Sequence, residues 1–232
     1  MGQSELAYIE VGARSIAYRL RSGNEPTLVF LPGYASDMEG AKALALDAFA
    51  ERRGLAMLRL DYSGTGSSGG KFEDGTLALW LEEAIAVIDQ LTQGPLILIG
   101  SSMGGWVVLH VALLRNERVR SLVGIAAAPD FTDWGFVDGD AAVRQGLNRR
   151  FWESGQQSLL LGQEIAIECP VRLIHGEQDQ DVPLDTASRL MRQLRSADVQ
   201  LKVIKGGGHR LSQRHEIDAI LHAVAGLLEP AS

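Results

Sequence analysis

Two kinds of hydrophobic pattern alternate along the chain. Short, almost wholly apolar runs, such as residues 96–99 (LILI), are typical of strands buried on both faces of a sheet. The stretches between them carry apolar side chains at helical spacing. We expect strands at residues 8–11, 16–20, 27–31, 56–60, 96–99, 121–126, 171–175 and 199–204, and helices at 41–53, 77–91, 103–114, 184–194 and 217–228.

This alternation predicts one α/β domain with a mostly parallel sheet and helices on both faces. The first two strands are joined by a turn at Gly12 with no helix between them, so we expect an antiparallel pair at one edge. Residues 21–26 are polar and are expected to form a turn. Gly54 directly follows the first helix and should cap its C-terminus.

Residues 130–168 interrupt the pattern. This segment is helical in character, and aromatic side chains such as Trp134, Phe136 and Phe151 stand among its polar residues. It lies between two expected core strands, and ligands of open α/β sheets bind beyond the carboxyl ends of the strands. We therefore expect a single domain over residues 1–232 in which residues 130–168 form a lid.

The residues around position 102 join an apolar strand to a helix. Residues 100–104 read Gly-Ser-Ser-Met-Gly and match the pattern G-x-S-x-G. At such a junction a sharp turn exposes the serine hydroxyl, and the amides at the start of the helix face the reacting oxygen. We predict Ser102 as a catalytic nucleophile, whereas Ser101 is out of register with the glycines. The alternative is a turn that merely contains small residues.

A serine hydroxyl needs a general base, and the chain has five histidines. His209 follows three glycines in a loop after the last expected strand, where it can reach a serine at the same edge of the sheet. We therefore predict His209 as the base. The others are expected to be packed, as His110 and His175, or at the surface, as His215 and His222.

An acid should orient the imidazole, and in this chain order it follows the serine and precedes the histidine. The loop after strand 171–175 offers three candidates. Glu177 is expected to face solvent, and Asp181, just before Val182-Pro183, is a candidate cap for the next helix. We predict Asp179 as the acid and keep Asp181 as the alternative.

An oxyanion that develops on the substrate needs two N–H donors. The amide after the nucleophile, that of Met103, is one candidate. The second should come from the loop after an early strand, and the amide of Tyr34 in Leu31-Pro32-Gly33-Tyr34 fits. Pro32-Gly33 would also serve simply to end the strand.

Residues 64–69 (GTGSSG) match the pattern G-x-G-x-x-G, which in other proteins binds dinucleotides. That fingerprint must open directly into a helix, whereas here a loop continues through Gly70 to Gly75. We interpret the segment as a structural loop braced by Asp61.

Composition narrows the possible partners. The chain has 46% hydrophobic and 22% charged residues, which is typical of a globular protein, and its net charge of −7 argues against nucleic acid. The single cysteine, Cys169, excludes an internal disulfide, and no Cys/His cluster has zinc-site spacing. We expect no cofactor or metal, no secretory signal, no stable membrane insertion and a cytoplasmic location; the oligomeric state stays open.

The motifs taken together resemble the α/β-hydrolase fold. They are Leu31-Pro32-Gly33-Tyr34, the run Asp61 to Ser68, Gly100 to Trp106, and His175-Gly176 with Asp179 and Val182-Pro183. More narrowly, the chain looks like the mitochondrial palmitoyl-protein thioesterase and acyl-glucuronide esterase group and its bacterial relatives. That resemblance implies a triad of Ser102, Asp179 and His209, although no transit peptide is evident here.

We therefore expect a serine hydrolase that cleaves acyl esters or thioesters of a small or S-acylated substrate through an acyl-enzyme on Ser102. A generic carboxylesterase for small esters is the alternative. A protein that keeps the fold but only binds a small ligand is a third reading, because fold does not fix function.

Overall fold

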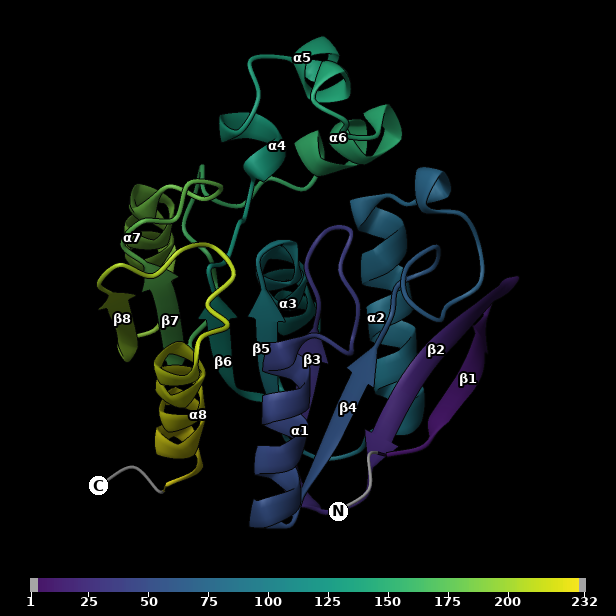
Figure 1. Ribbon diagram of the computed structural model, residues 1–232, viewed down its shortest axis with the longest axis vertical. Coiled ribbons are helices and arrows are strands. Elements are labelled where there is room, and N and C mark those ends of the chain that lie inside the picture. The colour runs from purple at the N-terminus through teal and green to yellow at the C-terminus, as the bar shows by residue number, and fades with distance from the viewer. Residues whose placement is uncertain (1–3, 230–232) are drawn as a thin grey trace.

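The computed structural model describes residues 4–229 (Figure 1). Its centre is an eight-stranded sheet in the order β1-β2-β4-β3-β5-β6-β7-β8. The β1–β2 and β2–β4 pairs are antiparallel and the remaining pairs are parallel, which confirms the predicted edge hairpin and mostly parallel sheet. The strands are β1 (Leu6–Val11), β2 (Arg14–Arg21), β3 (Asn24–Leu31), β4 (Leu55–Leu60), β5 (Leu96–Ser101), β6 (Val119–Ile125), β7 (Val171–Gly176) and β8 (Val199–Ile204).

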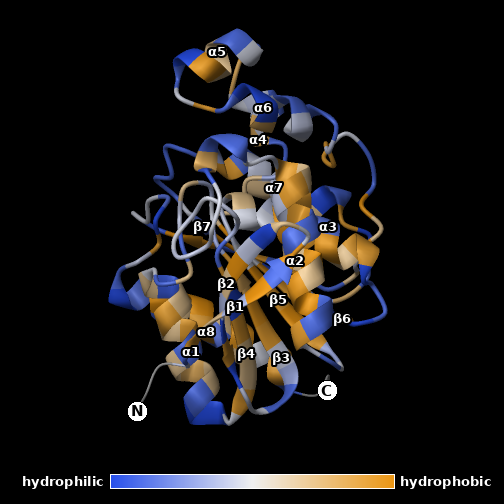
Figure 2. Cartoon of the chain, turned by 90° about the vertical axis from the view of Figure 1, so that its right-hand side faces the viewer, coloured by the Kyte–Doolittle hydropathy of each residue, from blue (hydrophilic) through white to orange (hydrophobic). Residues whose placement is uncertain are grey.

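Helices cover both faces of the sheet. One hydrophobic cluster packs α2, α3 and α7 against one face, and a second packs α1 and α8 against the other. Figure 2 shows the hydrophobic colour concentrated on the strands between these layers. The long helices are α1 (Ala41–Arg53), α2 (Leu77–Leu91), α3 (Met103–Leu114), α7 (Leu184–Gln193) and α8 (Arg214–Leu228); a short 3₁₀ turn, η1, spans Phe72–Asp74.

Local signals explain where several helices begin and end. Gly54 has φ 66° and its amide closes the end of α1, as predicted. The hydroxyl of Thr76 accepts a hydrogen bond from the amide of Leu79 and starts α2. In α8 the side chains of Gln213 and Glu216 form a capping box, so the helix starts at Arg214 rather than at residue 217. The apolar spacing missed this first turn because its residues are polar.

Two further predictions need correction. β3 begins at Asn24, so residues 24–26 are not a turn; Asn24 and Glu25 are exposed at the start of a strand that is buried from Pro26 onward. Asp181 does not cap α7, because the residue in the N-cap position is Pro183 and no side chain caps that helix.

The segment between β6 and β7 contains three short helices, α4 (Phe131–Trp134), α5 (Gly139–Arg144) and α6 (Arg149–Gln156). They lie above the carboxyl ends of the central strands, at the top of Figure 1. The insertion (residues 130–168) therefore overhangs the carboxyl ends of the strands at the centre of the sheet. Within residues 4–229, none of the helices combines the length and apolar character that a membrane crossing requires.

Candidate active site

Ser102 occupies a strained turn between β5 and α3. Its backbone has φ 54° and ψ −122°, a conformation that costs a non-glycine residue about 1–3 kcal/mol. Three backbone hydrogen bonds hold this turn. The Ser102 amide donates to the carbonyl of Ile125 at 2.9 Å, and the Ser102 carbonyl accepts from Gly105 at 2.8 Å and Ala128 at 3.0 Å.

The glycines around Ser102 are required by close backbone contacts. A Cβ on Gly100 would lie 2.3 Å from the carbonyl oxygen of Gly104, and a Cβ on Gly104 would lie 2.1 Å from that of Leu31. Neither neighbour is a flexible side chain that could turn away. The two glycines of the motif therefore allow α3 to pack closely against β3 and β5 beneath the serine.

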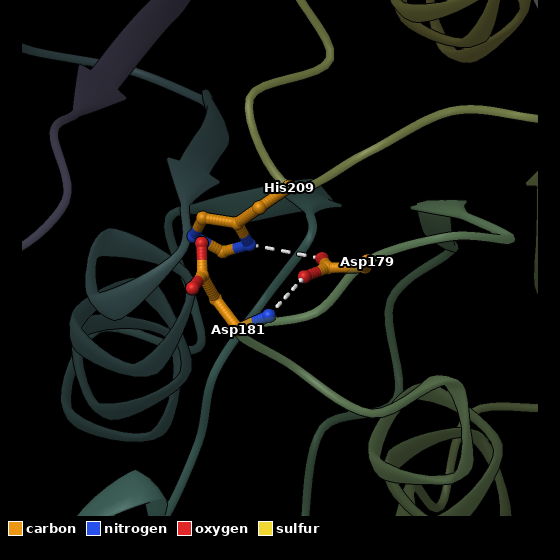
Figure 3. Close-up of side chains that lie close together, drawn as sticks. All are labelled: Asp179, Asp181 and His209. Atoms are coloured by element: carbon orange, nitrogen blue, oxygen red, sulfur yellow. Dashed lines mark hydrogen bonds and ion pairs between the residues drawn. The ribbon is translucent and has the colours of Figure 1, made fainter.

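The imidazole of His209 lies between Ser102 and Asp179. Its Nε2 is 3.0 Å from the hydroxyl of Ser102, and its Nδ1 is 2.9 Å from Oδ2 of Asp179. Figure 3 shows the second of these bonds. The three residues follow β5, β7 and β8, which all end at the same edge of the sheet. The structure thus brings together the three residues that the sequence predicts, in the geometry of a nucleophile, a base and an orienting acid.

The carboxylate of Asp179 is completely buried and well supplied with donors. Its Oδ1 accepts from the amides of Asp181 at 3.0 Å and Val182 at 2.9 Å. Burial alone would raise the pKa of this carboxyl, but the hydrogen bonds and charge of His209 and the two amides outweigh it, so the pKa lies below its usual 3.8. Asp179 is therefore ionised at neutral pH.

Asp181, the alternative acid, occupies a different place. Its side chain is exposed, and its amide rather than its carboxylate contacts Asp179 (Figure 3). One oxygen or nitrogen from each of Asp179, Asp181 and His209 lies within 4.8 Å of the others, a group that could hold a metal ion. Asp179 and His209 already bond to each other. This favours a role for His209 as a general base over a role for the group as a metal site.

The other histidines lie away from Ser102. His110 contacts the carbonyl of Ser158 at 3.0 Å, and burial lowers the pKa of its imidazole. His175 is buried, with its Nε2 2.9 Å from the carbonyl of Val182. His215 and His222 are exposed on α8. Each lies in the kind of environment that the sequence predicts.

The two amides predicted as oxyanion donors border the same space. Met103 is the first residue of α3, where amides lack a partner within the helix. Tyr34 follows Gly33, whose absent side chain leaves room for Ser102: a Cβ there would lie 3.2 Å from that of the serine. Tyr34, Met103 and Ser102 all line one cavity. Gly33 belongs to the loop from which the sequence predicts the second donor, and the structure adds that its lack of a side chain makes room for the serine.

Two cavities meet at Ser102 and His209. The aromatic cavity, of about 380 Å³, lies under the insertion and is lined there by Phe131, Trp134 and Phe136. It also contacts Gln145, Gln180 and Asp181, which the sequence did not single out for this role.

The charged cavity, of about 530 Å³, lies on the α1 side, where its lining includes Asp37, Lys42 and Arg210.

The glycine-rich loop after β4 has the structural role that we predicted. The carboxylate of Asp61 accepts hydrogen bonds from the amides of Met38 at 2.7 Å and Ser67 at 2.8 Å. A Cβ on Gly66 would lie 2.1 Å from the same carboxylate. The glycines therefore make room for Asp61, which ties this loop to the segment that leads into α1.

Known proteins share both sequence and structure with this chain. A family described as the alpha/beta hydrolase fold matches residues 26–145. The human protein named "Palmitoyl-protein thioesterase ABHD10, mitochondrial" is 33% identical over 238 aligned residues, which cover 94% of this chain and 78% of the human protein.

Solved structures show the same likeness. Alpha/beta hydrolase domain-containing protein 10 from mouse superposes with a TM-score of 0.90 at 30% identity, covering 97% of this chain and 98% of the mouse chain. A putative hydrolase from Agrobacterium vitis S4 superposes with a TM-score of 0.90 at 35% identity, covering 98% of this chain and 99% of its own. The similarity thus extends over nearly the whole chain, including the insertion.

Proposed function

This chain belongs to the α/β-hydrolase family and is an ester or thioester hydrolase, and from that premise we propose that Ser102, His209 and Asp179 are its catalytic triad. The single observation that carries the proposal is the continuous pair of contacts from the Ser102 hydroxyl through the imidazole to the buried carboxylate, at 3.0 and 2.9 Å.

The proposed reaction passes through an acyl-enzyme. Ser102 Oγ attacks the substrate carbonyl while His209 Nε2 takes the hydroxyl proton, and Asp179 stabilises the resulting imidazolium. The amides of Tyr34 and Met103 donate to the oxyanion, each contributing about 3–4 kcal/mol of transition-state stabilisation. The tetrahedral intermediate collapses, and His209 returns the proton to the departing thiol or alcohol. Water then attacks the acyl-enzyme with His209 again as base, and the free acid leaves.

The preferred substrate, we infer, is a thioester of a long or aromatic acyl group. Two features support this: the aromatic rings of the insertion beside Ser102, and the name of the human relative, which is a palmitoyl-protein thioesterase. The acyl group would occupy the aromatic cavity, and the leaving group the charged cavity. Residues 130–168 would then act as a lid over the acyl group.

Labelling with a fluorophosphonate tests the triad. Intact protein should be labelled, Ser102→Ala should not, and Ser101→Ala should be labelled like the wild type. Label retained in Ser102→Ala, or absent from every variant including the wild type, would contradict the proposed nucleophile and favour a binding protein.

Turnover of matched substrates tests the acyl preference. We expect kcat/KM to rise as the acyl group lengthens from acetyl to a long chain. For a given acyl group, we expect a higher kcat/KM with a peptide thioester than with an oxygen ester. A maximum at acetyl would instead support a carboxylesterase for small esters.

The cytoplasmic location remains our prediction from the sequence alone. The human relative is named as mitochondrial, which is a property of that protein. Imaging of the tagged full-length chain in its own cells tests the prediction, and co-localisation with an organelle marker would contradict it.

A further inference from the structure

The loop that carries His209 needs contacts from outside to fix its position. Residues 206–208 are all glycine, and Gly206 has φ 71°. A Cβ on Gly206 or Gly208 would meet nothing within 4 Å, so packing does not confine these two residues. Glycine has the largest backbone freedom of any residue. Hydrogen bonds to this part of the loop therefore contribute to keeping the imidazole in place.

Two of these hydrogen bonds come from the loop after β7, which also carries Asp179. The amide of Gln178 donates to the carbonyl of Gly207 at 2.8 Å, and the carboxylate of Glu177 accepts from the amide of Gly206 at 3.0 Å. Both act on the N-terminal side of His209. They hold the histidine close to its acid. Beyond His209, Leu211 is buried in the cluster that packs α1 and α8 on the sheet, so the backbone of Arg210 lies between this anchor and the histidine.

A third hydrogen bond acts on the other side and comes from α1. The ammonium of Lys42 donates to the carbonyl of Arg210, the residue after His209, at 2.5 Å. Lys42 is half-buried in the first turn of α1, directly after the loop that carries Tyr34. Burial, the largest influence, and the charge of Arg210 lower the pKa of its ammonium, and the nearby carboxylate of Glu216 offsets only part of this. A charged donor to a carbonyl is stronger than a neutral one.

We propose that Lys42 is a positioning residue for the hydrolytic reaction, holding the His209 loop so that Nε2 stays within reach of Ser102. The proposal rests on the triad assigned above. Lys42 joins the loop of the base to the first turn of α1 and lines the charged cavity that both Ser102 and His209 also line. A misplacement of about 1 Å in such a constellation can cost about 10²-fold in rate.

Lys42→Met tests the proposal because it keeps most of the apolar stem and removes the donor. With a p-nitrophenyl ester we expect kcat to fall about 10–100-fold with little change in KM or melting temperature. Lys42→Arg, which keeps a charged donor, should recover most of kcat. The matched control is Lys205→Met: Lys205 lies at the start of the same loop, is exposed and makes no side-chain hydrogen bond within residues 4–229, so wild-type kcat is expected.

The pattern of the losses separates this role from others. Because His209 serves both half-reactions, Lys42→Met should slow fluorophosphonate labelling of Ser102 by the same factor as kcat. A rise in KM with unchanged kcat would overturn the proposal and make Lys42 a leaving-group contact. Wild-type labelling and turnover in Lys42→Met would overturn it while leaving the triad intact, whereas failure of the triad shows as an unlabelled wild type.

Discussion

The turn at Ser102 and the insertion border the same aromatic cavity but are held in different ways. Backbone hydrogen bonds and glycines that touch other backbone atoms fix the turn. The insertion has three short helices and depends on side-chain contacts, such as the carboxylate of Asp130, which accepts from the amides of Leu160 and Leu161. At its outer edge Val137 is 95% exposed. The turn that carries the proposed nucleophile is thus fixed by the backbone, and the insertion by side chains.

The largest contrast should come from the two aspartates of the loop after β7. Asp179→Asn should lower kcat by about 10⁴-fold, because an amide favours the wrong imidazole tautomer. Asp181→Asn should stay within a few-fold of wild type, since its exposed carboxylate makes no hydrogen bond to His209. Steady-state kinetics of both variants measure this, and equal losses would contradict the assigned acid.

The pH dependence follows from the same residue. The folded-state pKa of Asp179 is depressed, so the stability it contributes is present above about pH 4 and is lost as the pH falls through the folded value. Asp179 therefore stays charged throughout the neutral range, and its protonation does not account for any loss of wild-type activity between pH 7 and about pH 5. A denaturation series against pH should show the acid-side loss shrink in Asp179→Asn.

A paired alanine substitution tests whether the backbone of the turn is the more rigid region. Gly104→Ala should lower the free energy of unfolding by about 2–4 kcal/mol and impair turnover, because its Cβ would overlap the carbonyl of Leu31. Gly162→Ala, in the insertion, has nothing within 4 Å and should stay within about 0.5 kcal/mol. Chemical denaturation measures both, and similar losses would remove the distinction between the regions.

The insertion should respond to loss of its anchor with weaker substrate binding. Asp130→Ala leaves the buried amides of Leu160 and Leu161 without their acceptor, so we expect a KM for a long-chain thioester about 10-fold higher, with kcat for an acetyl ester nearly unchanged. The control is Asp133→Ala, a neighbouring carboxylate that is exposed. Limited proteolysis should cut the insertion faster in the first variant only.

The smallest expected effect concerns the aromatic cavity. Phe136→Ala removes one of its rings and should lower kcat/KM for long-chain substrates by about 3–10-fold relative to acetyl substrates. The effect is small because a hydrophobic pocket gains little binding free energy from each apolar group. An acyl-chain series measures the ratio. An unchanged ratio would place the acyl group elsewhere.

Sequence could predict the elements whose ends carry a local signal. The bounds of α1 and α3 match the prediction because Gly54 closes the first and the serine motif opens the second. The starts of β3 and α8 were missed because polar residues there carry no periodic pattern. The predicted site residues follow strand ends that share one edge of the sheet, so their proximity could be inferred from the order of strands.

The rest could not be read from the sequence because it depends on long-range contacts. Asp130 and Leu160 meet across 30 residues with no motif at either end. Lys42 and Arg210 meet across 168 residues, and a lysine in the first turn of a helix looks like any surface charge. Which rings of the insertion face Ser102 likewise depends on how three short helices fold over the sheet.

The pair of cavities on either side of Ser102 has a kinetic consequence. If the acyl group stays on one side while the first product departs from the other, the vacated side admits whatever acceptor reaches it first. Small alcohols or thiols would then intercept the acyl-enzyme in competition with water, and the protein would behave as a transferase in their presence. The yield of transferred acyl group against acceptor concentration would measure how selectively that entrance admits water.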